Sequence, residues 1–104
     1  MSAIDLSLVR EFKRRAEAAL PGRVARVVLF GSRARGEARA ESDWDIAVVM
    51  PDEATPADWR ALGRISFDLT TEHGAFVQVV PLSLSRLGDG SALSSSVAAD
   101  GIAA

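Results

Sequence analysis

The sequence predicts a small α/β domain of the α+β kind: a mixed β-sheet with helices packed mainly on one face. Three apolar runs, at 24–30, 44–50 and 75–82, have the composition of strands. Helical periodicity precedes the first run and separates the second from the third. This order suits a single covered sheet. The 104 residues allow one domain, 1–104.

The first half of the chain is expected to form one helix and two strands. Over residues 3–20 apolar side chains recur at helical spacing, and Pro21-Gly22 ends the pattern. The β-branched run 24–30 predicts a buried strand. Residues 33–41 are small and charged, with room for only a short helical turn and a loop before the second strand, 44–50.

A second helix is expected to begin at residues 56–57, capped by Asp58 or Thr55, and to run to His73 before Gly74. Its apolar residues are expected to pack in the core together with Trp44 and Phe76: Trp59, Leu62, Ile65, Phe67 and Leu69.

The last third of the chain is expected to contain one strand and a weak helix. Residues 75–82 form the third strand, and residues 83–90 form a turn region. The Ser-rich segment 91–100 has weak helical character. Residues 101–104 form either a short edge strand or a frayed tail.

Composition excludes several classes of function. A formal net charge of −2 gives no basic stripe for duplex nucleic acid. The chain has no Cys, and so no disulfide framework or Cys-type zinc site. Neither a signal peptide nor an apolar run of the ~20 residues that span a bilayer is apparent. We therefore expect a cytoplasmic protein.

A phosphate-binding turn is expected directly after the first strand. Gly31 lacks a Cβ, so its backbone can approach a phosphate closely, and Ser32 adds a hydroxyl donor. A helical turn starting here would point free N–H groups at an anion. Arg33 and Arg35 either add cationic donors to a nucleotide or serve surface solubility.

A metal-binding pair is expected at the start of the second strand. Asp43 and Asp45 lie two residues apart, so both carboxylates point to one face while Trp44 and Ile46 point to the other. Two close carboxylates repel each other unless a cation lies between them. Mg²⁺ fits, because one or two carboxylates and substrate phosphates usually hold it.

Gly31-Ser32, ten residues, then Asp43-x-Asp45 resembles the signature of the minimal nucleotidyltransferases (MNT) of the DNA polymerase beta-like superfamily. The resemblance implies the polymerase beta-like fold. It also implies a reaction that uses Mg²⁺ and transfers a nucleoside monophosphate, expected to be AMP, from an NTP to a hydroxyl. It also implies the role of antitoxin to a HEPN-type toxin, a protein partner that some members adenylylate. Asp43 and Asp45 would then be catalytic metal ligands, and Gly31, Ser32, Arg33 and Arg35 would bind ATP.

One position departs from that family pattern. The family's third carboxylate usually lies on the next strand, and Gln78 occupies the matching position here. Its neutral amide is a weak magnesium ligand, so Mg–NTP binding would persist while catalysis weakens. Asp68 or Glu72 could replace the carboxylate only if the second helix leans over the site.

Three functions therefore remain open from the sequence. The chain is an active nucleotidyltransferase antitoxin, or a catalytically impaired antitoxin that neutralises its partner by occlusion and whose site is either vestigial or purely nucleotide-binding. A third reading is a nucleotide-sensing subunit of a larger transferase that receives the missing carboxylate from another chain.

Overall fold

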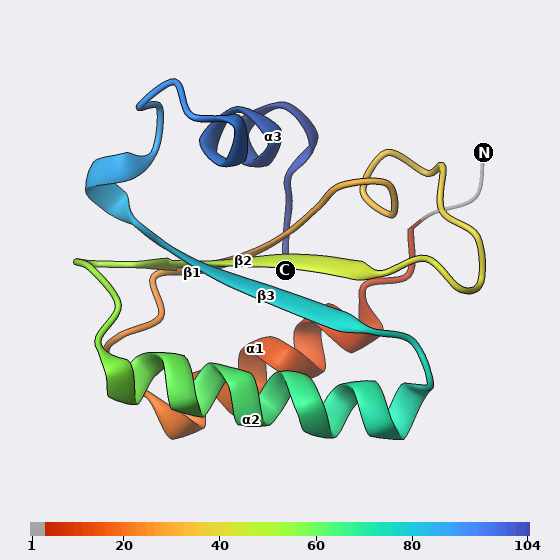
Figure 1. Ribbon diagram of the computed structural model, residues 1–104, viewed down its shortest axis with the longest axis horizontal. Helices are drawn as coiled ribbons and strands as arrows, with labels where there is room; N and C mark the ends of the chain where they lie inside the picture. Colours follow the sequence, from red (N-terminus) through yellow and green to blue (C-terminus); the bar gives the residue numbers. More distant parts are fainter. Residues whose placement is uncertain (1–3) are drawn as a thin grey trace.

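A computed structural model describes residues 4–104 as one four-stranded sheet with helices on both faces (Figure 1). The strands lie in the order β3-β2-β1-β4; β2 is antiparallel to β1 and parallel to β3, and β4 is antiparallel to β1. The predicted mixed sheet is confirmed. In chain order the elements are α1 (Ser7–Ala19), β1 (Arg26–Phe30), β2 (Trp44–Met50), α2 (Pro56–His73), β3 (Val77–Ser83), the 3₁₀ turn η1 (Leu84–Arg86), α3 (Ala92–Asp100) and β4 (Ile102–Ala103).

The two longer helices cover one face of the sheet, and α3 covers the other (Figure 1). The prediction that helices pack mainly on one face therefore holds for α1 and α2, while α3 packs on the opposite face. No helix within residues 4–104 has both the length and the apolar character needed to cross a membrane. The end of the chain forms the short edge strand β4, paired with Val28 and Leu29 of β1, and is not a frayed tail.

Helix α1 begins later than the sequence predicts. Residue 3, the expected first residue, lies outside the described residues, and residues 4–6 are not helical. The carboxylate of Asp5 accepts a hydrogen bond of 2.9 Å from the backbone N–H of Ser7. Such a local side-chain bond offers the backbone an alternative to the helix, so α1 starts at Ser7.

Helix α2 begins with a capping box that uses both expected residues. Thr55 Oγ1 accepts from Asp58 N at 3.1 Å, and Asp58 Oδ2 accepts from Thr55 N at 2.9 Å. Asp58 is 4% exposed, and its carboxylate also pairs with Arg23 at 2.7 Å. The helix ends at Gly74, as expected, in a left-handed conformation.

Three aromatic residues expected in the core are exposed. Trp59, Phe67 and Phe76 show 53%, 68% and 53% of their surface, while Leu62 and Leu69 are buried. The expectation was wrong because a helix turns about 100° per residue. Position 59 falls on the flank of α2, and position 67 lies on the side of the helix opposite the residues that face the sheet.

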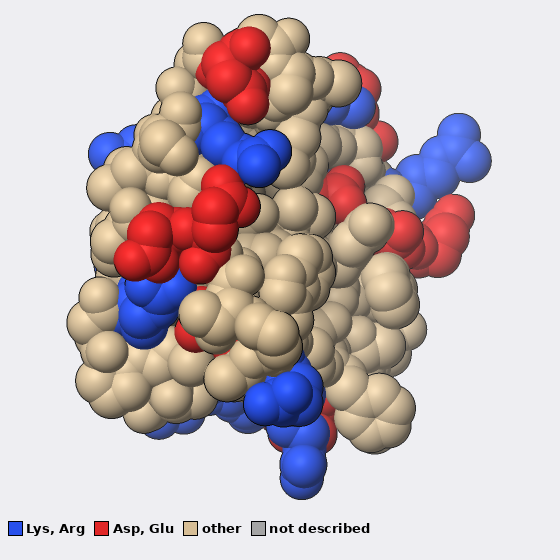
Figure 2. Space-filling model, turned by 60° about the vertical axis from the view of Figure 1, so that its left-hand side comes forward, with Lys and Arg blue, Asp and Glu red and all other residues tan. Residues whose placement is uncertain are grey.

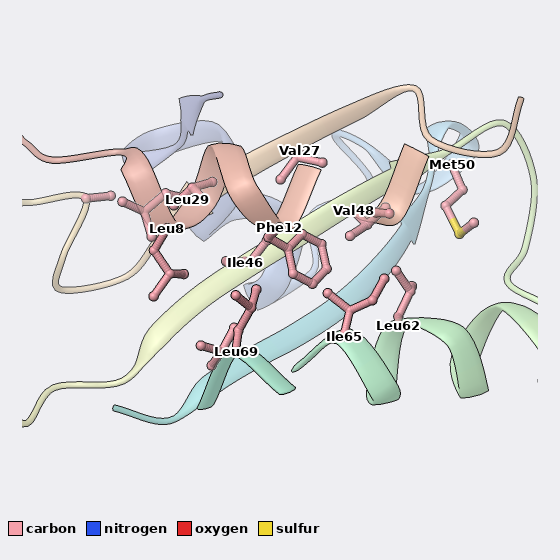
Figure 3. Packing of buried hydrophobic residues seen from close by; sticks show 14 residues of the cluster. Leu8, Phe12, Val27, Leu29, Ile46, Val48, Met50, Leu62, Ile65 and Leu69 are labelled. Carbon is pink, nitrogen blue, oxygen red and sulfur yellow. The ribbon is translucent and has the colours of Figure 1, made fainter. Parts of the chain in front are cut away.

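The main core lies between the sheet and the helices α1 and α2. Figure 3 shows side chains from all of these elements meeting there: Leu8, Phe12, Val27, Leu29, Ile46, Val48, Met50, Leu62, Ile65 and Leu69. A smaller cluster forms under α3, from Val28, Ala47, Val49, Leu82 and Val97. Because strand residues alternate between faces, odd-numbered positions of β2, including Asp45, lie on the α3 face.

The buried carboxylate of Asp58 predicts an acid-sensitive contribution to stability. The bond from Arg23, and then that from Thr55, hold the pKa of Asp58 below its ordinary value of 3.8. Stabilisation is therefore complete above the unfolded-state pKa and lost as pH falls through the folded one. We expect Asp58→Ala to lower the free energy of unfolding by about 2 kcal/mol at pH 7. Urea denaturation should show this difference shrinking below about pH 4.

The matched control is Asp52→Ala, which removes the other carboxylate in contact with Arg23. Asp52 is exposed, so its loss should change the unfolding free energy by less than about 0.5 kcal/mol. Equal effects of the two substitutions, or a difference independent of pH, would contradict the role given to Asp58.

Candidate nucleotide and metal site

The site is built where β1 ends and β2 begins. Gly31 follows β1 with a φ of 77°, a left-handed conformation that non-glycine residues rarely adopt. A Cβ placed on Gly31 would collide with Oδ2 of Asp45. The backbone of Gly31 thus lies directly against the Asp45 carboxylate. Glycine is required here by the backbone conformation and by the close approach.

Residues 31–37 form a tight turn after Gly31. The turn is closed by hydrogen bonds from Arg35 N to Gly31 O, at 3.2 Å, and from Glu37 N to Ser32 O, at 2.9 Å. A short helical turn was expected, and a single turn without a regular helix is found. Within residues 4–104, the backbone N–H groups of 32–34 and the Ser32 hydroxyl have no hydrogen-bond partner. The start of the turn therefore offers several free donors to an anion.

Asp43 and Asp45 are brought together at the start of β2. Asp43 is exposed immediately before the strand, and Asp45 is half-buried as its second residue. Burial, and then the negative charge of Asp43, raise the pKa of Asp45, while Arg35 opposes both effects. Two neighbouring carboxylates with like charge fit a hard cation such as Mg²⁺.

Gln78 lies on β3 directly beside Asp45. The parallel register pairs Asp45 with Gln78, so their side chains share the α3 face. Within residues 4–104 no group of three or more His, Cys, Asp or Glu side chains is placed to hold a metal ion. The position of the family's third carboxylate thus carries a neutral amide in this fold.

Neither proposed substitute for that carboxylate reaches the site. Helix α2 lies on the sheet face opposite Asp45 (Figure 1). Glu72 accepts two hydrogen bonds of 2.9 Å from Arg15 of α1, and Asp68 lies 3.6 Å from Arg64 of its own helix. Both carboxylates are therefore directed away from Gln78.

The two arginines of the turn point to different places. Arg33 donates to the backbone oxygens of Ser42, at 2.8 and 3.1 Å, and Ala40, at 3.2 Å, and its guanidinium lies 4.0 Å from the centre of the Trp44 ring. Its donors hold the loop between β1 and β2. Arg35 instead lies in the turn that begins at Gly31, where its backbone N–H donates to Gly31 O at 3.2 Å, and its positive charge opposes the rise in the pKa of Asp45.

A further residue at the site has no motif in the sequence. Asp100, at the end of α3, accepts a hydrogen bond of 3.0 Å from Arg35 across 65 positions of sequence. Only the packing of α3 and β4 onto the sheet brings the two residues together. The Ser-rich pattern of residues 91–100 contained no signal for this contact.

A family model described as a nucleotidyltransferase domain matches residues 8–86. A protein of Methanocaldococcus jannaschii is 36% identical to this chain over 61 residues. Its name, protein adenylyltransferase MJ0141, is provisional. That match covers 59% of this chain and 62% of the relative, so the chain spans less than two thirds of its length.

Several solved structures share the fold. One chain of a toxin–antitoxin complex with AMP-PNP has a TM-score of 0.68 and 23% identity, covering 95% of this chain and 71% of that one. A nucleotidyltransferase of Sulfolobus solfataricus, also an unproven assignment, has a TM-score of 0.64 and 24% identity, covering 94% and 77%. A chain of the Shewanella oneidensis complex of tri-AMPylated HEPN toxin with MNT antitoxin has a TM-score of 0.61 and 19% identity, covering 92% and 67%.

Gly31→Ala tests the contact with Asp45, and Gly36→Ala is its matched control. Both glycines are left-handed, with φ values of 77° and 75°, but a Cβ on Gly36 would meet nothing within 4 Å. Each alanine should cost about 1–2 kcal/mol of unfolding free energy. Only Gly31→Ala should also displace Asp45 and weaken Mn²⁺ binding, measured by calorimetry. Similar Mn²⁺ affinity in both variants would contradict this geometry.

Proposed function

Because the chain belongs to the nucleotidyltransferase domain family, we propose that it binds a nucleoside triphosphate with Mg²⁺ and transfers the nucleoside monophosphate, AMP, to a hydroxyl group. One observation carries the proposal. The Asp45 carboxylate lies against the Gly31 turn, so a metal on Asp43 and Asp45 would adjoin phosphates held by that turn. Phosphoryl chemistry of this kind depends mainly on positioning and on charge neutralisation.

The residues divide the work of binding. Ser32 and the free N–H groups that follow Gly31 hold phosphate oxygens, and Arg35 neutralises part of their charge. Asp43 and Asp45 would hold Mg²⁺, which supplies Lewis-acid stabilisation of the phosphates when bound. The acceptor oxygen bonds to the α-phosphorus, the bond to the β-phosphate oxygen breaks, and pyrophosphate leaves. The hydroxyl proton passes to solvent, because Gln78 cannot accept it as a carboxylate would.

The proposed acceptor is a hydroxyl on a protein partner, and the proposed role is that of an antitoxin to a HEPN-type toxin. Support comes from the name of the Methanocaldococcus jannaschii relative and from the AMPylated toxin in the Shewanella oneidensis complex. Nucleic acid is a poorer candidate. On the face in Figure 2, basic side chains lie beside acidic ones and form no continuous stripe.

The second candidate is an antitoxin that occludes its partner without transferring a nucleotide. Gln78 favours it, because among residues 4–104 no carboxylate stands in for this residue beside Asp45. A site with two carboxylates can retain Mg–ATP while the attacking hydroxyl lacks the metal that activates it.

The two candidates separate in one experiment. The chain is incubated with the purified HEPN-type protein, Mg²⁺ and ATP labelled at the α-phosphate, in wild-type form and as Asp43→Asn. Label on the partner with the wild type alone supports transfer. Neutralisation by both forms without label supports occlusion. Absence of Mg–ATP binding by the wild type in calorimetry would contradict nucleotidyl transfer and leave occlusion as the function.

Gln78→Asp should create the missing third carboxylate. A third negative charge beside Asp45 should lower the melting temperature in the absence of metal. Mn²⁺ or Mg²⁺ should reverse this loss, because a ligand that binds only the folded state stabilises it. We expect Mn²⁺ affinity to rise about tenfold, measured by calorimetry and thermal unfolding.

Gln78→Asn is the control, since it shortens the side chain in the same way without adding charge. It should leave both the melting temperature without metal and the Mn²⁺ affinity near wild type. An increase in affinity with Asn, or none with Asp, would show that residue 78 does not face the metal.

A further inference from the structure

The guanidinium of Arg35 is held beside the two carboxylates of the site without pairing with them. It donates to Asp100 Oδ2 at 3.0 Å and to Glu37 Oε2 at 3.3 Å. Within residues 4–104 it makes no ion pair of 4.0 Å or less with Asp43 or Asp45. Its backbone N–H donates to Gly31 O at 3.2 Å, and the backbone of Gly31 lies directly against the Asp45 carboxylate. An unpaired carboxylate pair ordinarily attracts such a cation, so something restrains Arg35.

Asp100 is the better placed of the two restraints. Its side chain is 21% exposed, against 64% for Glu37. It ends α3, and the next residue, Gly101, packs so closely that an added Cβ would meet Val97 O and the Val28 side chain. Strand β4 then pairs Ile102 with Leu29. Asp100 is thereby fixed at the end of β1 where the site lies.

The negative charge of Asp100 lies at the C-terminal end of α3, where the helix dipole disfavours it. The C-terminal end of a helix carries partial negative charge, which opposes a carboxylate and favours a cation. The last turn of α3 contains no basic residue, and within residues 4–104 the ion-pair partner of Asp100 is Arg35. A residue that breaks a local preference and is satisfied only by a distant group of the site is a candidate for function.

We propose that Asp100 is a positioning residue that holds the Arg35 guanidinium next to Asp43 and Asp45 but off them. The two carboxylates then stay open to the metal, and the guanidinium stays free to meet the phosphates. The inference rests on the proposed function, because it assigns Asp100 to the same nucleotide site.

Loss of the Asp100 charge releases Arg35 toward the other carboxylates. Arg35 would pair with Asp45, since a charge-assisted bond to a half-buried carboxylate is stronger than one to water-exposed Glu37. A guanidinium on Asp45 occupies the space of the metal and neutralises the charge that attracts it. Metal and nucleotide affinity should therefore fall together.

The test is Asp100→Asn, which keeps the shape of the side chain. Calorimetry should show Mn²⁺ alone and Mg–ATP binding about tenfold more weakly than to wild type. Glu37→Gln removes the exposed carboxylate beside Arg35 and is the matched control, with less than about a twofold change expected. Wild-type affinity in Asp100→Asn overturns the proposal.

A double-mutant cycle separates positioning from a merely structural role. With Arg35→Gln present, Asp100→Asn should weaken Mn²⁺ binding no further, because no guanidinium remains to be released. An equal loss in both backgrounds shows that Asp100 acts through the stability of α3 and overturns the proposal.

A crystal structure of Asp100→Asn keeps the inference distinct from the proposed function. If the wild type binds neither Mn²⁺ nor Mg–ATP, the proposed function fails. Even then, Arg35 paired with Asp45 in the variant supports the restraint by Asp100. Arg35 still held away from Asp45 overturns it.

Discussion

The contact between the Gly31 backbone and the Asp45 carboxylate is the constraint on which the site depends. The antiparallel register sets Phe30 opposite Asp45, so the chain must leave β1 and return to β2 at one point of the sheet. The left-handed conformation of Gly31 makes the turn after β1 tight enough for the Asp45 carboxylate to contact the Gly31 backbone. The proposed phosphate donors and the proposed metal ligands thereby become neighbours.

The two faces of the sheet differ: one packs the larger hydrophobic core, and the other bears the candidate site. The face under α1 and α2 holds the larger core, with Phe12, Ile46 and Leu69 among its fully buried side chains. The other face has a smaller cluster under α3, and on that face Asp45 is half-buried and Gln78 is exposed. Most of the hydrophobic stabilisation is thus separated from the site. Asp45 can tolerate burial and a raised pKa because the opposite face supports the sheet.

Local patterns in the sequence predicted most of the fold and the position of the candidate metal ligands at the start of β2. Strand periodicity placed Asp43 and Asp45 on one face, and the capping residues placed the start of α2, because both effects act over a few residues. Contacts made by packing were not predictable in this way. The helical pattern included Phe67 in the core, although it lies on the side of α2 that faces away from the sheet.

The arginines show the same limit within the site. Arg33 and Arg35 are indistinguishable as charges in the sequence, yet one lies over Trp44 and the other reaches Asp100. Their directions depend on where the β1–β2 loop and the end of α3 come to rest. Such placement follows from the whole fold, and no spacing rule in the sequence records it.

The position of Gln78 explains how binding and catalysis could be separated in one domain. Of the two carboxylates that would bind the metal, Asp45 belongs to the central strand β2 and Asp43 directly precedes it, whereas Gln78 is exposed on the edge strand β3. A carboxylate at 78 would add repulsion beside Asp45 whenever the metal is absent, and the neutral amide removes that repulsion. The amide leaves the Gly31 turn and the β2 carboxylates unchanged. An edge-strand residue can therefore weaken the chemistry without disturbing the fold or the nucleotide site.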